Sequence, residues 1–344
     1  MPLTFDLLVI GDASPYVMLG PLDAPVDDPL AVGGRAQRVD SGALTLGGSA
    51  AVTACGAARL GLRVAVAGRV GDDDAGDYVR DRLAAHGVNT NALRVDDALP
   101  TPLTTVVTHG GGQVVISAPG TRAAITRYDI PERLLTRSGH VHCASFFLMP
   151  KLAADLPHLF AAAHAAGVTT SLGTDDDPPG RWDHTALAPV LAWTDLLLTD
   201  AYQAGLMAGK DGGCVASAAE LLAGQGPLVA VRNGADGALC HDGDTLLTTA
   251  GIRVTARDAV VAGDSFNAGF ITARLAGRSP AEALGIAAVC GALSARAGGG
   301  TAAQPTWAQA LAHLTTVGGT VRRDHPGCVN APFTRPSCPP RRPA

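Results

Sequence analysis

The chain has 344 residues, a formal net charge of −5 and a hydrophobic fraction of 47%. This length accommodates one large α/β domain with an appendage, or two ordinary domains. The acidic balance excludes the basic field that favours nucleic acid, so we expect no nucleic-acid partner. No apolar run approaches the roughly 18 residues of a membrane span, and residues 1–10 do not resemble a secretory signal. The seven cysteines form no Cys-x-x-Cys pair, which is typical of a reducing compartment. We therefore expect a cytoplasmic protein with no membrane partner.

Short apolar runs alternate with helical patterns along most of the chain. The runs that are typical of buried strands are Leu7–Ile10, Val64–Ala67, Val141–Phe146, Val168–Leu172, Leu196–Leu198 and Leu228–Val231. The helices predicted between them span about 48–60, 74–86, 151–166, 214–223, 264–276 and 279–297. This alternation predicts an α/β fold in three layers, with a mostly parallel central sheet covered by helices on both faces.

Two regions interrupt the alternation, residues 13–46 and about 91–118. The second region has apolar–polar alternation on both sides of Gly110–Gly112, which is typical of a β-hairpin. We expect these two segments to form a small antiparallel β lid. From Gly318 onward the chain is rich in Pro, Arg and Gly and shows no periodicity. The sequence therefore predicts one domain over residues 1–317 and a disordered tail over 318–344.

Residues 258–270 carry the clearest chemical signal. Small residues up to Gly263 run into an acid, Asp264, at the predicted start of a helix. A turn before a helix N-terminus directs unpaired backbone N–H groups at one spot, which suits an anion. There Asp264 would remove the proton of an attacking hydroxyl, while the amides of Ala262 and Gly263 hold the charge that develops on a transferring phosphoryl group. The alternative is that Asp264 is only a helix cap.

Four segments, in order, resemble the signatures of the ribokinase (PfkB) family of carbohydrate kinases. Residues 47–61 resemble the first signature, and 66–76 the strand, Gly-Asp-Asp and helix after it. Residues 231–237 resemble the turn that contacts the nucleotide, and 258–270 the second signature, which carries the catalytic base. The resemblance implies a ribokinase-like fold, ATP and Mg²⁺, a monovalent cation such as K⁺, and a lid that covers the sugar. In this family the lid often makes a dimer contact, so a homodimer through the lid is expected.

The resemblance also assigns the acceptor pocket, which is shaped by Ser14, Tyr16, Gly47, Gly48 and Val52. Two of these positions depart from the family pattern. Tyr16 stands where the family has an acid that binds sugar hydroxyls, and Val52 stands where it has an asparagine. A pocket built to pair hydroxyls would lose their partners there. We therefore expect a more apolar pocket, which an aromatic wall would fit to a nucleoside or another ring-bearing alcohol.

The resemblance places nucleotide binding at Asp200, Arg232, Gly234, Gly237 and Val261. The family's Asn-x-x-Glu, which organises magnesium, is here Asp200-Ala-Tyr-Gln203. Asp200 and Gln203 are therefore the candidate metal residues, since magnesium prefers oxygen ligands, and the alternative for Asp200 is a helix cap. Arg232 could add a bidentate phosphate contact. Val261 replaces Gly or Ala and would crowd a phosphate.

Two further clusters of polar residues, a pair of histidines and a run of acids, lie outside these motifs. His140 and His142 share one side of a strand but have no third ligand at metal spacing, which favours a role in the core. Asp175–Asp177 precede a Pro-Pro-Gly turn, which indicates a solvated loop.

Together these features predict an enzyme, a kinase that transfers the γ-phosphate of ATP to a hydroxyl of a small sugar-like acceptor, with Asp264 as general base. Two alternatives remain. A nucleoside kinase is favoured by Tyr16 and Val52. A nucleotide- or sugar-binding pseudokinase is favoured by Gln203 and Val261, although such a protein has no need of a base at position 264.

Overall fold

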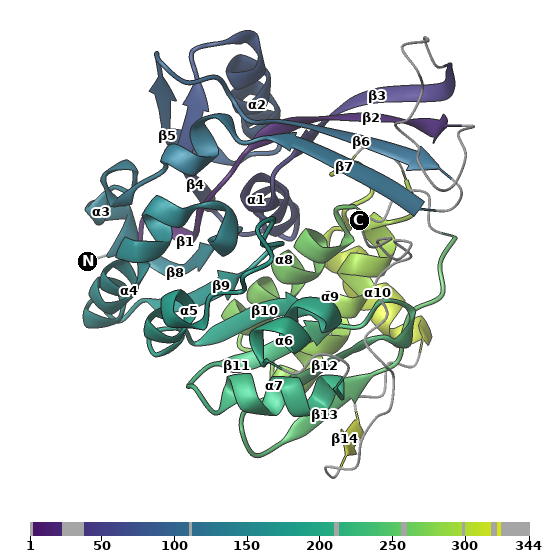
Figure 1. The fold of residues 1–344 in the computed structure, drawn as a ribbon. Helices are drawn as coiled ribbons and strands as arrows, with labels where there is room; N and C mark the ends of the chain where they lie inside the picture. The colour runs from purple at the N-terminus through teal and green to yellow at the C-terminus, as the bar shows by residue number, and fades with distance from the viewer. Residues whose placement is uncertain are drawn as a thin grey trace, which may run out of the picture.

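The computed structural model describes residues 3–22, 38–109, 112–209, 213–255, 260–297, 300–317 and 322–324. These residues form a large central sheet, helices on its two faces, and a smaller sheet that projects from it (Figure 1). None of the described helices is both long and apolar enough to span a bilayer.

The central sheet has ten strands in the order β14-β13-β12-β11-β10-β9-β8-β1-β4-β5. From β5 to β11 neighbouring strands pair in parallel, and from β11 to β14 they pair antiparallel. The strands are β1 (Phe5–Ile10), β4 (Val64–Gly71), β5 (Asn89–Asp96), β8 (Ser138–Cys143), β9 (Thr169–Gly173), β10 (Leu196–Asp200), β11 (Leu228–Arg232), β12 (Ala238–His241), β13 (Leu246–Thr249) and β14 (Arg322–Asp324). The predicted mostly parallel sheet is thus confirmed.

Alternate residues of the central strands enter two separate cores. Leu7 and Val9 of β1 face one core, while Leu8 and Ile10 face the other, because successive side chains of a strand point to opposite sides. The first core is closed by α1 (Ser49–Arg59), α2 (Asp74–Ala85), α8 (Ala262–Leu275), α9 (Pro280–Ser294) and α10 (Trp307–Val317). The second is closed by α3 (Glu132–Leu135), α4 (Pro150–Ala165), α5 (His184–Leu191), α6 (Ala201–Met207) and α7 (Val215–Ala223). Burial on both faces explains why these strands read as continuous apolar runs.

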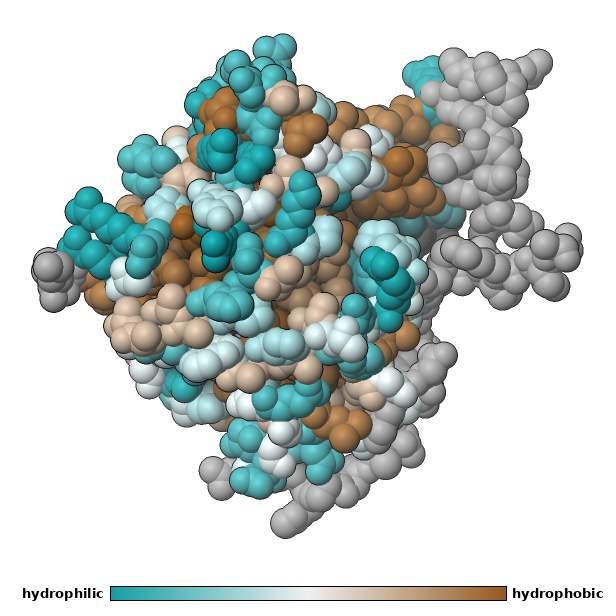
Figure 2. Space-filling view, turned by 60° about the vertical axis from the view of Figure 1, so that its left-hand side comes forward, coloured by the Kyte–Doolittle hydropathy of each residue, from teal (hydrophilic) through white to brown (hydrophobic). Residues whose placement is uncertain are grey.

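The smaller sheet is the predicted lid and has the order β3-β2-β6-β7. Its strands are β2 (Ser14–Leu22), β3 (Val39–Gly47), β6 (Leu103–His109) and β7 (Gly112–Ala118). The pairs β2–β3 and β6–β7 are antiparallel as predicted, but β2 and β6 pair in parallel. Several large apolar side chains of the lid are exposed, and apolar surface lies at the end of the molecule where the lid projects (Figure 2).

Several boundaries differ from the sequence prediction. The strand predicted over Val141–Phe146 begins at Ser138 and ends at Cys143, because Ser145 adopts a left-handed conformation (φ 56°) that turns the chain. Strand β5 falls within the second predicted lid region but pairs with β4 in the central sheet. In the predicted tail, β14 pairs with β13, whereas residues 318–321 and 325–344 lie outside the described residues.

Candidate active site

Five neighbouring strands end at one edge of the central sheet, and the polar residues at their ends meet there. Asp12 follows β1, Ser145 follows β8, and Asp175 lies two residues beyond β9. Asp200 and Arg232 end β10 and β11 and are paired in register. Open α/β sheets bind ligands at the carboxyl ends of their strands, so this edge is the candidate active site.

Helix α8 brings its N-terminus to this edge. The first hydrogen bond within the helix runs from the Ser265 N–H to the Val261 carbonyl, at 3.1 Å. The N–H groups of residues 262–264 therefore have no acceptor inside the helix. Val261 precedes the helix and is buried, and Asp264 lies in the first turn. The helix end thus combines a carboxyl group with N–H groups that have no acceptor within the helix itself.

The Asp264 carboxyl group has an unusual electrostatic setting. Burial is the main cause that raises its pKa, to about 8, and the nearby charges of Asp175 and Asp12 act in the same direction. A hydrogen bond from Ser49 and the positive charge of Arg232 oppose the rise. A general base is most effective when its pKa lies near the working pH, so this setting suits the predicted role.

Helix α1 begins opposite α8, and its first residue, Ser49, donates a hydrogen bond to Asp264 Oδ1. The turn before it needs glycine. Gly48 has φ 85°, and a Cβ atom there would lie 2.7 Å from the Asp12 carbonyl oxygen. That same carbonyl accepts the Ala51 N–H at 3.2 Å, which fixes α1 against the end of β1. The first signature is therefore a rigid turn that brings a serine hydroxyl to the Asp264 carboxyl group.

A pair of acids that the sequence analysis did not assign to the site, Asp12 and Asp175, lies beside Asp264. Ser145 Oγ lies 2.8 Å from Asp12 Oδ1 and 3.1 Å from Asp175 Oδ2. A hydroxyl has one proton, so Ser145 donates to one of the two carboxyl groups at a time. Burial is the main cause that raises the pKa of Asp175, and the charge of Asp12 acts in the same direction. Arg122 Nη1 lies 3.5 Å from Asp12 Oδ2 and balances its charge.

The positions of Asp175 and Asp177 correct one interpretation made from the sequence. The solvated loop expected at Asp175–Asp177 is wrong for two of its three acids: Asp175 faces the site, and the buried Asp177 accepts the N–H groups of Arg181 and Trp182 at 2.7 Å each. The signal that could have found Asp12 and Asp175 is their position directly after a predicted strand.

The predicted acceptor residues are only partly brought together. The ring of Tyr16 packs on Gly47, where any side chain would collide with it. Burial, followed by the charges of Asp12, Asp175 and Asp264, raises the pKa of the Tyr16 hydroxyl, so the ring lies among the three acids. Ser14 is buried and its hydroxyl has no hydrogen-bond partner among the described residues. Val52 has no exposed surface and therefore borders no open space in this structure.

Arg232 connects the strand ends to α8. Its Nη1 donates to the Gly263 carbonyl at 3.3 Å and to Asn267 Oδ1 at 3.0 Å, and its Nη2 lies 3.9 Å from Asp200 Oδ2. A Cβ atom at Gly263 would lie 2.9 Å from the Arg232 guanidinium carbon, so glycine permits this close approach. The guanidinium therefore lies against the same first turn that presents the free amides.

The turn after β11 has the geometry expected of its glycines. Gly234 and Gly237 adopt φ values of 55° and 102°, and a side chain at Gly237 would strike the Thr249 carbonyl. The Asn233 N–H closes the turn by donating to the Gly237 carbonyl at 2.8 Å. Arg232, the last residue of β11, directly precedes this turn.

The candidate metal residues do not fit a prebuilt magnesium site. Asp200 Oδ1 caps α6 by accepting the Gln203 N–H at 2.8 Å, which confirms the cap alternative for that oxygen. Gln203 is buried, and its Oε1 accepts the hydroxyls of Thr174 and Thr199 at 3.0 and 3.1 Å. The role of Gln203 as a metal ligand is therefore not supported, since its carbonyl oxygen is already used. Asp200 keeps one oxygen, which faces Arg232.

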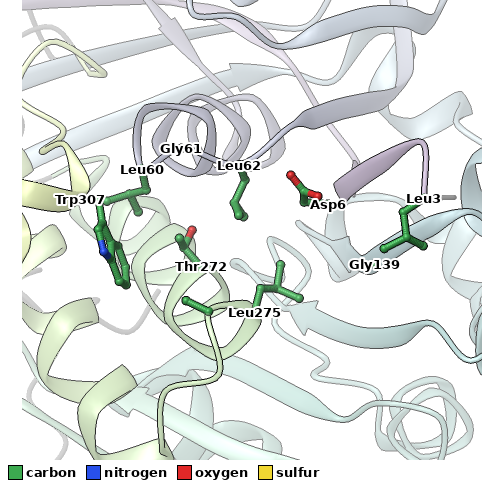
Figure 3. A pocket seen from close by; sticks show the side chains of 10 residues that line it. Leu3, Asp6, Leu60, Gly61, Leu62, Gly139, Thr272, Leu275 and Trp307 are labelled. Carbon is green, nitrogen blue, oxygen red and sulfur yellow. The ribbon is translucent and has the colours of Figure 1, made fainter.

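Two other features, an open pocket and a pair of histidines, lie away from the candidate active site. An open pocket of about 420 Å³ occupies the opposite edge of the sheet, where Leu60, Leu62, Leu275 and Trp307 surround it (Figure 3). His140 and His142 are buried, as the core interpretation predicted. Ser171 Oγ lies 2.7 Å from His140 Nε2 and 2.8 Å from His142 Nδ1, and burial lowers the pKa of both to about 3.

The three-layer fold, the β lid and the carboxyl group in the first turn of α8 define a small-molecule kinase of the α/β type. The model of the pfkB family of carbohydrate kinases matches residues 7–307. The chain belongs to this family and is an ATP-dependent phosphotransferase that acts on a sugar.

Individual proteins agree with this membership. The ATP-dependent ribose-1-phosphate kinase of Halopiger xanaduensis is 33% identical over 250 residues, which cover 72% of this chain and 80% of that protein. The structure of Arabidopsis thaliana ribokinase with ribose and ATP has a TM-score of 0.75 at 22% identity, covering 91% and 99% of the two chains. Adenosine kinase from Sinorhizobium meliloti has a TM-score of 0.77 at 20% identity, covering 91% and 99%. These two structures share the fold.

Proposed function

We propose that this kinase transfers the γ-phosphate of ATP to a hydroxyl of a small sugar-like acceptor, with Asp264 as the general base. The observation that carries the proposal is the position of Asp264. Its carboxyl group lies at a helix N-terminus whose first N–H groups have no acceptor within the helix, accepts a hydrogen bond from the Ser49 hydroxyl, and has a pKa raised to about 8. An acceptor hydroxyl bound in this place would be both oriented and deprotonated.

The charge that builds up during transfer would be stabilised from the α8 side. The amides of 262–264 form the proposed anion hole, because the helix dipole and the unpaired N–H groups act on the same spot. Arg232 lies against this turn and would hold a phosphate oxygen with its guanidinium. The turn from Gly234 to Gly237 would contact the nucleotide beside it. Magnesium would come with the ATP phosphates, near the remaining oxygen of Asp200.

The acceptor would bind between Tyr16 and the acids Asp12 and Asp175. Their carboxyl groups can accept hydrogen bonds from sugar hydroxyls, so Asp12 and Asp175 would take the role of the acid that Tyr16 replaces. This supports a polar, hydroxylated acceptor rather than the less polar acceptor that the more apolar pocket predicted from the sequence would bind. Because the relative from Halopiger xanaduensis is named for ribose 1-phosphate, that sugar phosphate is a first acceptor to test.

A nucleoside acceptor is the second candidate, and Tyr16 is the observation that favours it. Its ring lies over Gly47 and offers an aromatic wall on which a base can stack. The likeness in fold to an adenosine kinase is compatible with this alternative.

We also propose a homodimer through the lid. The lid sheet exposes Leu44, Leu103, Val115 and Ile116, each at least 44% exposed. Leu44, Leu103 and Ile116 share one face of the lid sheet, and contiguous exposed apolar surface is a mark of interaction sites. Light scattering on the purified protein tests this, and a monomer at micromolar concentration would contradict it.

Replacing the base provides the direct test. Asp264→Asn should lower turnover by roughly 10²–10⁴-fold, the usual contribution of a positioned base, while ATP affinity stays close to that of the wild type. The assay offers Mg-ATP with ribose, fructose, ribose 1-phosphate and adenosine in separate reactions. A variant with more than about a tenth of wild-type activity would rule out Asp264 as the base. ATP binding without turnover of any acceptor by the wild type would favour a pseudokinase instead.

A further inference from the structure

The hydrogen bond between Ser49 and Asp264 joins two residues 215 positions apart in the sequence. Ser49 is the first residue of α1, where a serine hydroxyl would ordinarily be available to backbone groups of its own helix. Here it crosses to α8 and donates to the carboxylate that is proposed to activate the acceptor. No other side-chain donor to that carboxylate is found among the described residues.

The position of Ser49 is firmly held. The Gly47–Gly48 turn and the Asp12 carbonyl fix the start of α1. One turn further on, Thr53 Oγ1 donates to the Asp264 carbonyl at 3.4 Å. Gln304 then bridges the two helices, because its Nε2 donates to the Val52 carbonyl and lies 3.0 Å from Ser265 Oγ. The hydroxyl of Ser49 is therefore a fixed part of the site.

A kinase with a charged base and bound ATP faces a competing reaction. If water takes the place of the acceptor, the base removes a proton from the water, whose oxygen then forms a bond to the γ-phosphorus. The bond from that phosphorus to the β-phosphate oxygen breaks, and ADP and phosphate leave. A hydroxyl that is hydrogen-bonded to the base excludes water from this position. Because it is anchored to a helix, it cannot itself move to attack the γ-phosphorus.

We propose that Ser49 suppresses hydrolysis of ATP: in the absence of acceptor its hydroxyl is hydrogen-bonded to Asp264 in place of water, and the acceptor hydroxyl displaces it. This rests on the proposed role of Asp264. Ser49 is thus a positioning residue that acts through Asp264, and its effect is on the choice between acceptor and water.

The test measures ATP hydrolysis with Mg-ATP alone and acceptor phosphorylation in parallel. Ser49→Ala should raise the ratio of acceptor-free hydrolysis to acceptor phosphorylation by about tenfold or more, up to the limit of roughly 10²–10⁴-fold that a positioned base contributes. Ser49→Thr keeps the hydroxyl and should return the ratio close to that of the wild type. Thr53→Val is the matched control, because it removes a hydroxyl that bonds to the main chain of Asp264 and not to its carboxylate.

The outcomes separate this inference from the proposed function. If Asp264→Asn keeps acceptor phosphorylation, the proposed base is wrong and the proposed role of Ser49 is refuted as well. If Asp264→Asn abolishes phosphorylation but Ser49→Ala hydrolyses ATP no faster than the wild type, only the proposed role of Ser49 is refuted. The same conclusion follows if Thr53→Val raises the ratio equally, or if mass spectrometry finds phosphate on Ser49 after incubation with ATP. The double variant Ser49→Ala/Asp264→Asn should lose the extra hydrolysis.

Discussion

The pKa of Asp264 makes the enzyme's pH dependence a sharp prediction. With a pKa of about 8, roughly 10% of the carboxyl groups are ionised at pH 7 and roughly 90% at pH 9. Only the ionised form can accept the proton of the acceptor. We therefore expect kcat/KM for the acceptor to rise by about tenfold from pH 7 to pH 9, because kcat/KM reports the protonation of the free enzyme.

The assay follows ADP formation from pH 6 to 9.5 at each acceptor concentration, with a direct measurement of phosphorylated product as a control. Asp175→Asn removes a negative neighbour, so the midpoint of the rise should move to lower pH even if the maximum falls. A profile that is flat between pH 6 and 9, or that rises near pH 4 like an ordinary carboxyl group, would refute the electrostatic reasoning. An unmoved midpoint in Asp175→Asn would refute the assigned cause.

The remaining predictions concern stability and the two binding halves of the site. Because the folded-state pKa of Asp264 lies above its ordinary value of 3.8, this residue costs the native state stability as pH rises from about 4 to 8. Asp264→Asn should therefore raise Tm by about 5 °C or more at pH 9 and change it little below pH 4, as measured by calorimetry. Arg232→Met should raise the KM for ATP by about tenfold or more, since it removes charge-assisted hydrogen bonds to phosphate, and an unchanged KM would place the guanidinium outside the nucleotide site. Tyr16→Ala should raise the KM for the acceptor by about tenfold and leave the KM for ATP unchanged, a split that steady-state kinetics resolves and that equal changes in both would contradict.

Local patterns explain how much of the fold could be predicted. The strand pattern at Leu7–Ile10 and the amphipathic helices carry their periodicity within a few residues, so the alternating sheet and its two helical layers were foreseeable. Asp264 was foreseeable for the same reason, because a glycine turn, an acid and a helix start are contiguous. Short helices such as α6, with seven residues, have too few turns to show a period.

The rest of the site depends on the order of strands in space. Asp12, Ser145 and Asp175 are far apart in the sequence and meet only because β1, β8 and β9 are neighbours in the sheet. Each follows a strand, but sequence patterns do not state which strands will be adjacent. The Asp175–Asp177 run was for this reason interpreted by its composition, as an acidic loop, rather than by its place.

The lid has an unusual attachment that links movement to recognition. Only residues 11–13 separate β1 of the central sheet from β2 of the lid, and the lid returns to α1 through the Gly47–Gly48 turn. Four connections join the lid strands to the rest of the described chain: residues 11–13, the turn at Gly48, residues 97–102 and the turn after Ala118. Asp12 stands in the first of these connections, and the second precedes Ser49. Any change in the tilt of the lid must alter the direction of the backbone that carries these groups. If the acceptor binds beside Asp12 as proposed, the binding groups lie in this connection, so a change in the tilt of the lid would reach the acceptor without any contact at the far end of the lid.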